Sequence, residues 1–323
     1  MKLTIAVTGA SGFVGKALCA KLLARGYSVR AVVRERSSCL LSPTDCLQVV
    51  EVGEIGGLTD WTAALTGVDC VFHCAAHVPM MHKTGNDVLA AYRAVNVEGT
   101  RRLAEEAETL GVRRLVFMSS IKAIGEQTAH GLSFTAHSEP APEDAYGKSK
   151  CETEEMLREF SLRFGLEVVI IRPPLVYGPG VKGNLRRLLV LVRSGLPLPF
   201  GAINNLRTLV GLGNLVDLLI RCADHPDASG QTFLVADGEE LSTPELIRHM
   251  AAAMGKSVRI LPVPVFLLRF VGCMIGRSEE IDRLVGSLQV DISHTCQVLD
   301  WSPPFSVDEG LQGMVNYAPD ARV

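Results

Sequence analysis

The chain has 323 residues, of which 47% are hydrophobic and 21% charged, and its formal net charge is −3. This composition is typical of a soluble globular protein with a sizeable core and excludes an intrinsically disordered chain. The charged residues form no concentrated basic patch, so we expect no nucleic-acid partner.

The nine cysteines include no CxxC pair, and the eight histidines show no metal-ligand spacing. We therefore expect reduced cysteines, no metal site and a cytoplasmic protein. The apolar run in MKLTIAVTGASG is too short for a signal peptide. No segment has the ~18 uncharged apolar residues of a membrane span. The nearest is 260–276, interrupted by prolines and Arg269, which predicts a buried or dimer-facing helix, with weak membrane-surface contact as the alternative.

Apolar segments rich in β-branched residues alternate with helical patterns through the first half of the chain. Helices are expected after the first glycine loop, over about 87–110 and from near Tyr146. The expected strands are 3–7, 28–34, 47–52, 69–75, 113–120 and 166–173. The alternation predicts an α/β fold with a Rossmann-type, doubly wound parallel sheet covered on both faces.

The character of the sequence changes after Pro173, where the segment RPPLVYGPGVKGN is rich in turn residues. Shorter helical and strand patterns follow, broken by prolines and glycines. We expect residues 1–173 to form a dinucleotide-binding domain. Residues 174–323 are expected to form a smaller substrate-binding lobe, from which some segments return to the sheet.

The segment GASGFVG lies between the first expected strand and the first helix. In such a loop Gly9 permits a tight turn, Gly12 lets the backbone approach a pyrophosphate, and Gly15 allows close helix–strand packing. The pyrophosphate then lies at the positive end of the helix. The loop therefore predicts a dinucleotide site, to which Ser11, Phe13 and Val14 also belong.

The end of the second expected strand bears on the choice of cofactor. An acid there would bind the ribose 2′-hydroxyl of NAD, but the position holds Val33, followed by Arg34. An arginine can make a two-pronged contact with a 2′-phosphate, and Ser11, Ser37 or Ser38 can add hydroxyl donors. We therefore favour NADP(H), while NAD remains possible because Arg34 and Arg36 can equally be solvated charges.

A serine pair and a YxxxK segment predict the catalytic group. Ser119 and Ser120 end the fifth expected strand, at the carboxyl edge where ligands of such sheets bind. Tyr146 and Lys150 lie one helical turn apart. A free tyrosine has a pKa of about 10, and a nearby lysine cation favours the phenolate. With a serine hydroxyl on the substrate oxygen, this group suits hydride exchange with a nicotinamide.

Together these segments resemble the extended short-chain dehydrogenase/reductase family, in particular its NAD-dependent epimerase/dehydratase (UDP-glucose 4-epimerase-like) members. The family's asparagine-containing helix resembles VNVEGTRRL, and its turn after the sixth strand resembles RPPLVYGPG. A segment of nucleotide-sugar epimerases resembles NLRTLVGLGNLVDLL. The resemblance covers nearly the whole chain. It implies a nucleotide-sugar substrate, and we also expect a homodimer.

The resemblance implies a role for individual residues. Tyr146 would be the general acid/base, Lys150 its activator and a ribose ligand, and Ser120 the catalytic serine, with Ser119 beside it. Asn96 would organise the region around the nicotinamide. The remaining implied contacts are Glu54, Ala75, Ala76 and Pro173 for the cofactor and Lys122, Asn184, Arg207 and Arg283 for the substrate. The segment SSIKAIGE departs from the family pattern, so Lys122 and Glu126 either approach the sugar or are surface residues.

Two reactions of the family suit this chain. The overall pattern resembles bacterial enzymes that reduce a UDP-linked 4-keto-6-deoxy-N-acetylhexosamine for surface polysaccharide (lipopolysaccharide) synthesis. With the expected NADP(H), we favour this 4-ketone reduction. The alternative is an NAD-dependent 4-epimerase of the UDP-glucose or UDP-N-acetylglucosamine type. A reductase of small ketones and a non-catalytic NADP-binding protein are further alternatives.

Overall fold

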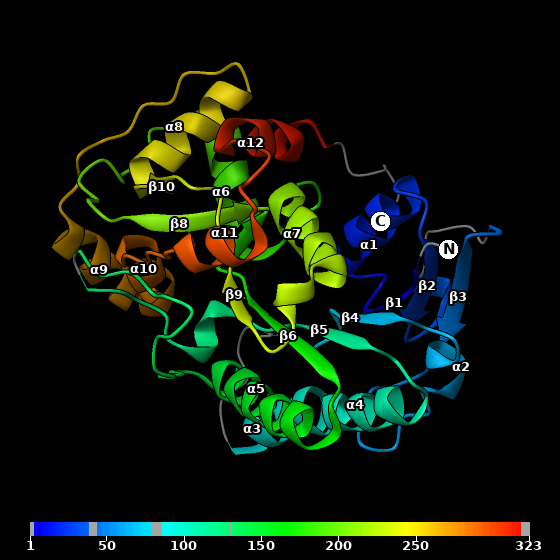
Figure 1. Cartoon of the computed structure of the whole chain (residues 1–323). Helices are drawn as coiled ribbons and strands as arrows, with labels where there is room; N and C mark the ends of the chain where they lie inside the picture. Colours follow the sequence, from blue (N-terminus) through cyan, green and yellow to red (C-terminus); the bar gives the residue numbers. More distant parts are fainter. Residues whose placement is uncertain (1–2, 39–43, 79–85, 130, 318–323) are drawn as a thin grey trace.

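The computed structural model describes residues 3–38, 44–78, 86–129 and 131–317, and its main feature is a seven-stranded parallel sheet (Figure 1). The strand order is β3 (Leu47–Glu51), β2 (Ser28–Val33), β1 (Thr4–Thr8), β4 (Cys70–His73), β5 (Arg114–Met118), β6 (Glu167–Arg172) and β9 (Thr232–Leu234). The order reverses between β1 and β4, where doubly wound sheets bind ligands. The predicted Rossmann fold is confirmed.

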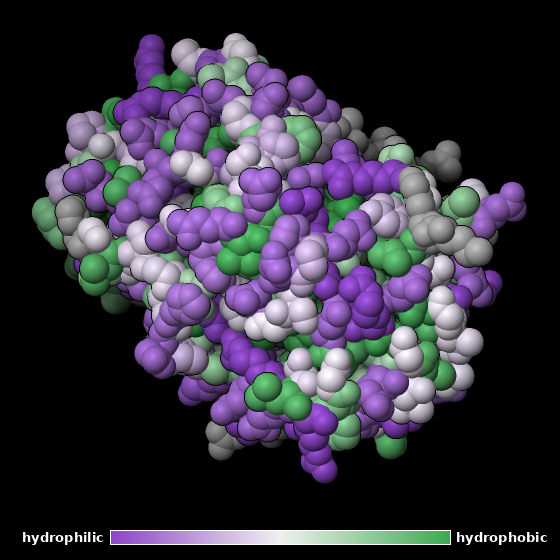
Figure 2. Space-filling model, in the orientation of Figure 1, coloured by the Kyte–Doolittle hydropathy of each residue, from purple (hydrophilic) through white to green (hydrophobic). Residues whose placement is uncertain are grey.

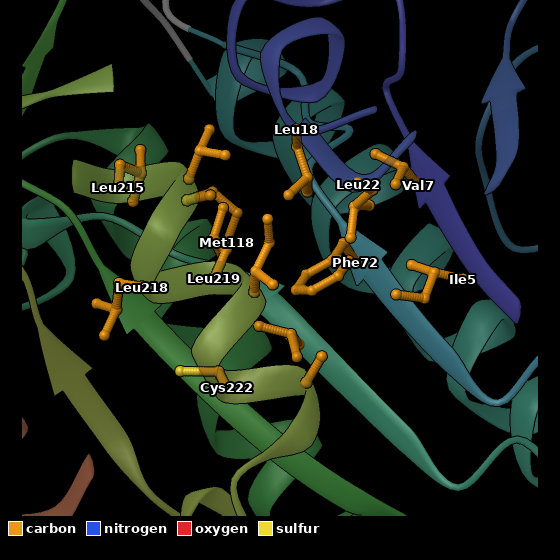
Figure 3. Close-up of a cluster of buried hydrophobic side chains, with 14 of the residues drawn as sticks. Ile5, Val7, Leu18, Leu22, Phe72, Met118, Leu215, Leu218, Leu219 and Cys222 are labelled. Atoms are coloured by element: carbon orange, nitrogen blue, oxygen red, sulfur yellow. The ribbon is translucent and has the colours of Figure 1, made fainter. Parts of the chain in front are cut away.

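Helices cover both faces of this sheet, which explains its near-continuous apolar strands. One face is packed by α1 (Phe13–Ala24) and α7 (Leu212–Asp224), the other by α2 (Thr62–Leu65), α4 (Gly99–Thr109) and α5 (Ala145–Phe164). Figure 3 shows Leu219 of α7 on the side of that helix that faces Leu18 of α1 and Phe72 of β4. These side chains fix the sheet edge that carries the candidate site.

The helix expected over 87–110 is present but interrupted. It consists of α3 (Asn86–Tyr92), a π-helical segment, η2 (Arg93–Glu98), and α4. Within η2, the Asn96 carbonyl accepts hydrogen bonds from the hydroxyls of Thr100 (2.6 Å) and Thr153 (3.0 Å). A π-segment inside an α-helix is frequent at functional sites.

The chain beyond Pro173 builds a second layer on the carboxyl edge of the sheet. Its three-stranded sheet has the order β10 (Glu240–Leu241), β8 (Arg207–Gly211) and β7 (Leu175–Tyr177). Its helices are α6 (Gly183–Arg193), α8 (Thr243–Ala253), α9 (Val265–Met274), α10 (Ser278–Val285), α11 (Ser293–Leu299) and α12 (Val307–Asn316). Strand β9 and helix α7 pack in the main unit, so the proposed lobe is not one contiguous segment.

The segment 260–276 contains α9, which is exposed along most of its length. Only Leu268 and Gly272 of this helix are buried. The expectation of a buried helix is therefore wrong, while the alternative of a helix that faces a second copy stays a prediction. Among the described residues, no helix is both long and apolar enough to cross a membrane.

Candidate active site

The glycine loop packs as tightly as the pattern predicts. Gly9 has a φ of +66°, and a Cβ there would lie 2.8 Å from the Ala75 nitrogen. A Cβ on Gly15 would lie 2.2 Å from the Gly9 carbonyl oxygen. Gly12 caps α1 without a side-chain bond and is exposed, so the first N–H groups of the helix are open to an anion. This cradle fits a dinucleotide pyrophosphate; Ser11 is exposed beside it, and Phe13 and Val14 are half-buried.

At the end of β2, Val33 is buried and Arg34 extends to the surface. The Arg34 Nη1 lies 3.3 Å from Glu54 Oε1, and both side chains are largely exposed. Arg36 is used differently, because its Nη2 donates to the Val49 carbonyl at 3.1 Å. The structure thus brings Arg34 and Glu54, both expected at the cofactor, into one ion pair and ties Arg36 to β3.

The two serines after β5 have different surroundings. The buried Ser119 hydroxyl donates to Glu154 Oε1 at 2.5 Å, and Glu154 also pairs with the buried Arg172 at 2.6 Å. The Ser120 side chain is half-exposed and, within the described part of the chain, accepts a single hydrogen bond, from the Lys122 backbone N–H at 3.2 Å. Ser119 therefore belongs to a buried network between α5 and β6, while the Ser120 hydroxyl can still donate to a substrate oxygen.

Tyr146 and Lys150 occupy the first turns of α5. Asp144 caps this helix, accepting from the Gly147 N–H at 2.6 Å. The Lys150 Nζ lies 5.9 Å from the centre of the Tyr146 ring and donates to the Met118 carbonyl at 2.8 Å. Since Met118 ends β5, this bond fixes the lysine at the edge of the sheet that carries Ser120.

The acid–base properties of this pair differ from the expectation. Burial lowers the pKa of Lys150 to about 8. Burial, followed by the charge of Asp144 and the proximity of Tyr92, raises the pKa of Tyr146 above its ordinary value. The expected depression of the tyrosine pKa by Lys150 is therefore wrong for the protein alone. Without bound ligands, burial and Asp144 favour the neutral phenol.

Asn96 holds the loop after β4 against α5. Its Oδ1 accepts from the His77 N–H at 2.8 Å, and its Nδ2 donates to Ser149 Oγ at 3.0 Å. The Ala75 N–H donates to the Thr8 hydroxyl at 3.2 Å. Ala75 and Ala76 are half-buried, and the buried Pro173 accepts from the Ile121 N–H beside Ser120. The predicted cofactor residues after β4 and β6 thus line one edge of the sheet.

Lys122 belongs to an ion-pair chain beside the tyrosine. Its Nζ contacts Asp144 Oδ2 at 2.6 Å and Glu126 Oε1 at 2.8 Å. Arg283 lies 3.9 Å from the other Glu126 oxygen. The chain Asp144–Lys122–Glu126–Arg283 therefore connects the start of α5 with α10. The sequence reasoning did not include Asp144 in the site, although an aspartate directly before a helix is a signal for an N-cap.

The other predicted substrate residues surround α10. Arg207 donates to the carbonyls of Arg283 (2.5 Å) and Gly286 (3.2 Å), and burial lowers its pKa. Asn184 is exposed on α6, whose Arg187 pairs with Glu280 of α10 at 2.9 Å. Lys122, Arg207 and Arg283 are thus brought together, and Asn184 lies on the adjoining helix. Among the described residues, no acid, histidine and cysteine cluster is suited to a metal ion.

Comparison with known proteins identifies the family. The NAD dependent epimerase/dehydratase family matches residues 5–236. A UDP-glucose 4-epimerase of Vibrio cholerae is 45% identical over 97% of this chain and 94% of its own. An N-acetyl-alpha-D-glucosaminyl-diphospho-ditrans,octacis-undecaprenol 4-epimerase of Escherichia coli O157:H7 is 27% identical over 80% of this chain and 75% of its own.

Among solved structures, the UDP-glucuronic acid 4-epimerase of Bacillus cereus in complex with NAD has the same fold. The TM-score is 0.77 at 22% identity, covering 98% of this chain and 96% of that one. The family match contains the glycine loop, Ser120, Tyr146 and Lys150. The chain therefore belongs to the NAD dependent epimerase/dehydratase family and is an enzyme of the extended short-chain dehydrogenase/reductase type.

Proposed function

We propose that the protein is an NAD-dependent 4-epimerase of a nucleotide sugar, of the UDP-glucose or UDP-N-acetylglucosamine type. The observation that carries the proposal is the group formed by Ser120, Tyr146 and Lys150 beside the glycine loop. It occurs in a chain that is 45% identical, over 97% of its length, to a protein named UDP-glucose 4-epimerase. The reaction favoured from the sequence, reduction of a 4-ketone, has less support.

The catalytic roles follow from the positions of the side chains. A nicotinamide dinucleotide held at the glycine loop would supply the hydride acceptor and donor. In its phenolate form, Tyr146 takes the proton of the C4 hydroxyl and later returns it, and Ser120 donates a hydrogen bond to the same oxygen. Lys150 places a positive charge near the tyrosine ring and, held by the Met118 carbonyl, keeps a fixed position. Epimerisation additionally needs room for the keto-sugar to present its other face.

The diphosphate of the substrate would bind beside α10. Arg283 is partly exposed and pairs with the exposed Glu279 at 3.5 Å and with Glu126 at 3.9 Å. Both contacts are long, so its guanidinium can turn to a phosphate. Arg207 holds the end of α10 through two carbonyls and presents a second positive charge. Asn184 adds an amide from α6. These substrate contacts are part of our proposal. We also propose a division of the chain near residue 173, a homodimer and a cytoplasmic location.

A second candidate is the NADP(H)-dependent reduction of a nucleotide-linked 4-keto-6-deoxy sugar for surface polysaccharide synthesis. Its specific support is the end of β2, where Val33 replaces an acid and Arg34 is exposed. Under this alternative, Arg34→Ala weakens NADPH binding by about 1.5–3 kcal/mol, the range for hydrogen bonds to charged groups, and leaves NADH unchanged. Calorimetric titration of both cofactors measures this, and equal effects on the two would remove the argument for NADP(H).

Two parallel assays separate the candidates. In the first, the purified protein is incubated with UDP-glucose or UDP-N-acetylglucosamine, with catalytic NAD present. In the second, it receives a 4-keto-6-deoxy sugar nucleotide and NADPH. We expect the C4 epimer in the first assay. Stoichiometric NADPH consumption in the second, with no epimer in the first, would replace the epimerase by the reductase.

A further inference from the structure

Five polar side chains are fully buried between the glycine loop and the start of α5. Hydrophilic residues cover much of the visible face of the protein, as Figure 2 shows, because a buried polar group is costly unless it is hydrogen-bonded. Each of the five is at most 2% exposed: Thr8, His73, Asn96, Thr100 and Ser149. His73 is the ionisable group among them, and the proposed reaction gives it no role.

His73 ends β4 beside Thr8, its pairing partner at the end of the neighbouring strand β1 (Figure 1). The Thr8 hydroxyl oxygen lies 2.7 Å from His73 Nδ1, and the Thr100 hydroxyl oxygen of α4 lies 2.9 Å from Nε2. The rings of Trp61 and Phe117 pack around the imidazole, with centroids 6.4 and 6.0 Å away. Both ring nitrogens are therefore hydrogen-bonded among aromatic side chains.

The bond beyond Thr100 determines which nitrogen of His73 carries the hydrogen. The Thr100 hydroxyl donates to the Asn96 carbonyl at 2.6 Å, and a carbonyl oxygen can only accept. A hydroxyl has one hydrogen, so Thr100 must accept from His73, whose Nε2 therefore carries the hydrogen. The geometry thus specifies the chain of bonds from the imidazole into the π-helical segment η2.

The other side of the imidazole is an acceptor that faces the glycine loop. Burial, followed by the charge of Lys150, lowers the pKa of His73 to about 3, so the ring is neutral. In a neutral ring with its hydrogen on Nε2, Nδ1 accepts, and the Thr8 hydroxyl donates to it. The Thr8 oxygen in turn accepts from the Ala75 N–H at 3.2 Å. Each bond in the chain therefore has one donor and one acceptor.

The two ends of this chain of bonds lie in the two parts of the candidate site. Thr8 directly precedes Gly9, the tight turn of the glycine loop. At the other end, Asn96 Nδ2 donates to Ser149 Oγ at 3.0 Å, and the Ser149 hydroxyl donates to the Tyr146 carbonyl at 2.8 Å. Hydrogen bonds therefore run from the glycine loop, through the imidazole, to the helical turn that carries the tyrosine.

We propose that His73 is a positioning residue, which holds the glycine loop and the Asn96 segment in the arrangement that binds the nicotinamide cofactor. A fully bonded buried network gives the surrounding elements one arrangement, and the imidazole is its rigid member between β1 and α4. A phenylalanine ring could pack against Trp61 and Phe117 as well, so packing alone does not require the two bonds. This role rests on the proposed use of a nicotinamide cofactor. Cofactor binding is measured without sugar, so its failure and that of the epimerase reaction are distinguishable.

The test is calorimetric titration of the full chain with NAD and, separately, with NADPH. Thr100→Val keeps the shape of the side chain but can neither accept from His73 nor donate to Asn96. The dissociation constant of the dinucleotide that the wild type binds more tightly should rise by about tenfold, as for the loss of one or two hydrogen bonds. Thr100→Ser, which keeps the hydroxyl, should bind like the wild type. His73→Phe, which keeps a buried ring without nitrogens, should weaken binding at least as much as Thr100→Val.

The matched control is Thr295→Val in α11. This threonine is also fully buried, and its hydroxyl donates to the Leu234 carbonyl at 2.6 Å, the distance that separates the Thr100 hydroxyl from the Asn96 carbonyl. Urea unfolding should show a similar loss of stability in both valine variants, because each loses one buried hydroxyl bond. Thr295→Val should nevertheless bind the dinucleotide like the wild type.

The proposal is overturned if Thr100→Val and His73→Phe lose stability but bind the dinucleotide like the wild type, because His73 would then only support the core. It is overturned equally if Thr295→Val weakens binding as much as Thr100→Val, or if the wild type binds neither NAD nor NADPH. Should His73→Phe fail to fold, the comparison of Thr100→Val with Thr100→Ser decides.

Discussion

At the scale of single residues, the two adjacent serines provide a direct comparison. Ser120→Ala should reduce turnover by about 10²-fold, as expected for the loss of one donor to the reacting oxygen. Ser119→Ala should change turnover by less than about tenfold but cost ~1–3 kcal/mol of stability, because Glu154 loses a buried partner. Steady-state kinetics and urea unfolding of both variants measure this. The reverse pattern would make Ser119 the catalytic serine.

Asp144 should set the pH dependence of the tyrosine. Its charge raises the pKa of Tyr146, so removing the charge lowers that pKa and makes the phenolate available at lower pH. In Asp144→Asn the amide oxygen can still accept from the Gly147 N–H and cap α5. We therefore expect the rising limb of the pH–kcat profile to move to lower pH.

The matched control for this pH profile is Glu143→Gln, which removes a charge one position away. Its carboxylate accepts from the Glu126 N–H at 3.0 Å, a bond that glutamine can keep. The control profile should coincide with that of the wild type. An unmoved profile in Asp144→Asn, or an equal shift in both variants, would show that Asp144 does not act on Tyr146.

At the scale of helices and strands, a buried ion pair joins α5 to β6. Arg172 and Glu154 are 3% and 1% exposed and lie 2.6 Å apart. Glu154→Ala leaves the buried arginine without its main partner and should cost about 3–5 kcal/mol of unfolding free energy. The control Glu152→Ala lies two positions before Glu154 on α5. It removes an exposed pair with Arg93 and should cost at most ~1 kcal/mol.

Urea unfolding followed by circular dichroism measures both losses. If the Glu154 and Glu152 variants lost equal stability, the buried pair would not be what fastens α5 to the sheet. The comparison also bears on the site, because the same helix carries Tyr146 and Lys150 at its start.

The elements differ in how far the sequence could predict them. The first six strands were predictable because a two-sided sheet demands continuous apolar runs between turn residues. The π-segment at Asn96 was not predicted, and one of the hydrogen bonds to its carbonyl comes from Thr153, 57 positions away on α5. The exposure of α9 was not predictable either. Its apolar composition predicts burial, and the burial of Leu268 and the contact of Gly272 with Ile281 show which side faces the protein.

At the scale of the whole molecule, the site arises where the two layers meet. The glycine loop, Ser120, Tyr146 and Lys150 come from short motifs whose spacing alone places them on one edge of the sheet, so the sequence predicted their proximity. The partners of Lys122 and Arg207 come from distant segments. Asp144 lies 22 positions from Lys122, and the carbonyl of Arg283 lies 76 positions from Arg207. No local pattern specifies such contacts.

The most direct test of the proposed reaction is proton NMR of UDP-glucose or UDP-N-acetylglucosamine incubated in D₂O with the purified protein and catalytic NAD. An epimerase moves the C4 hydrogen as hydride and returns it within the site. We therefore predict the C4 epimer with hydrogen, not deuterium, at C4, and a rate about 10²–10⁴-fold lower for Tyr146→Phe. No epimer from either sugar nucleotide, in a protein that reduces a 4-keto sugar nucleotide with NADPH, would contradict the account.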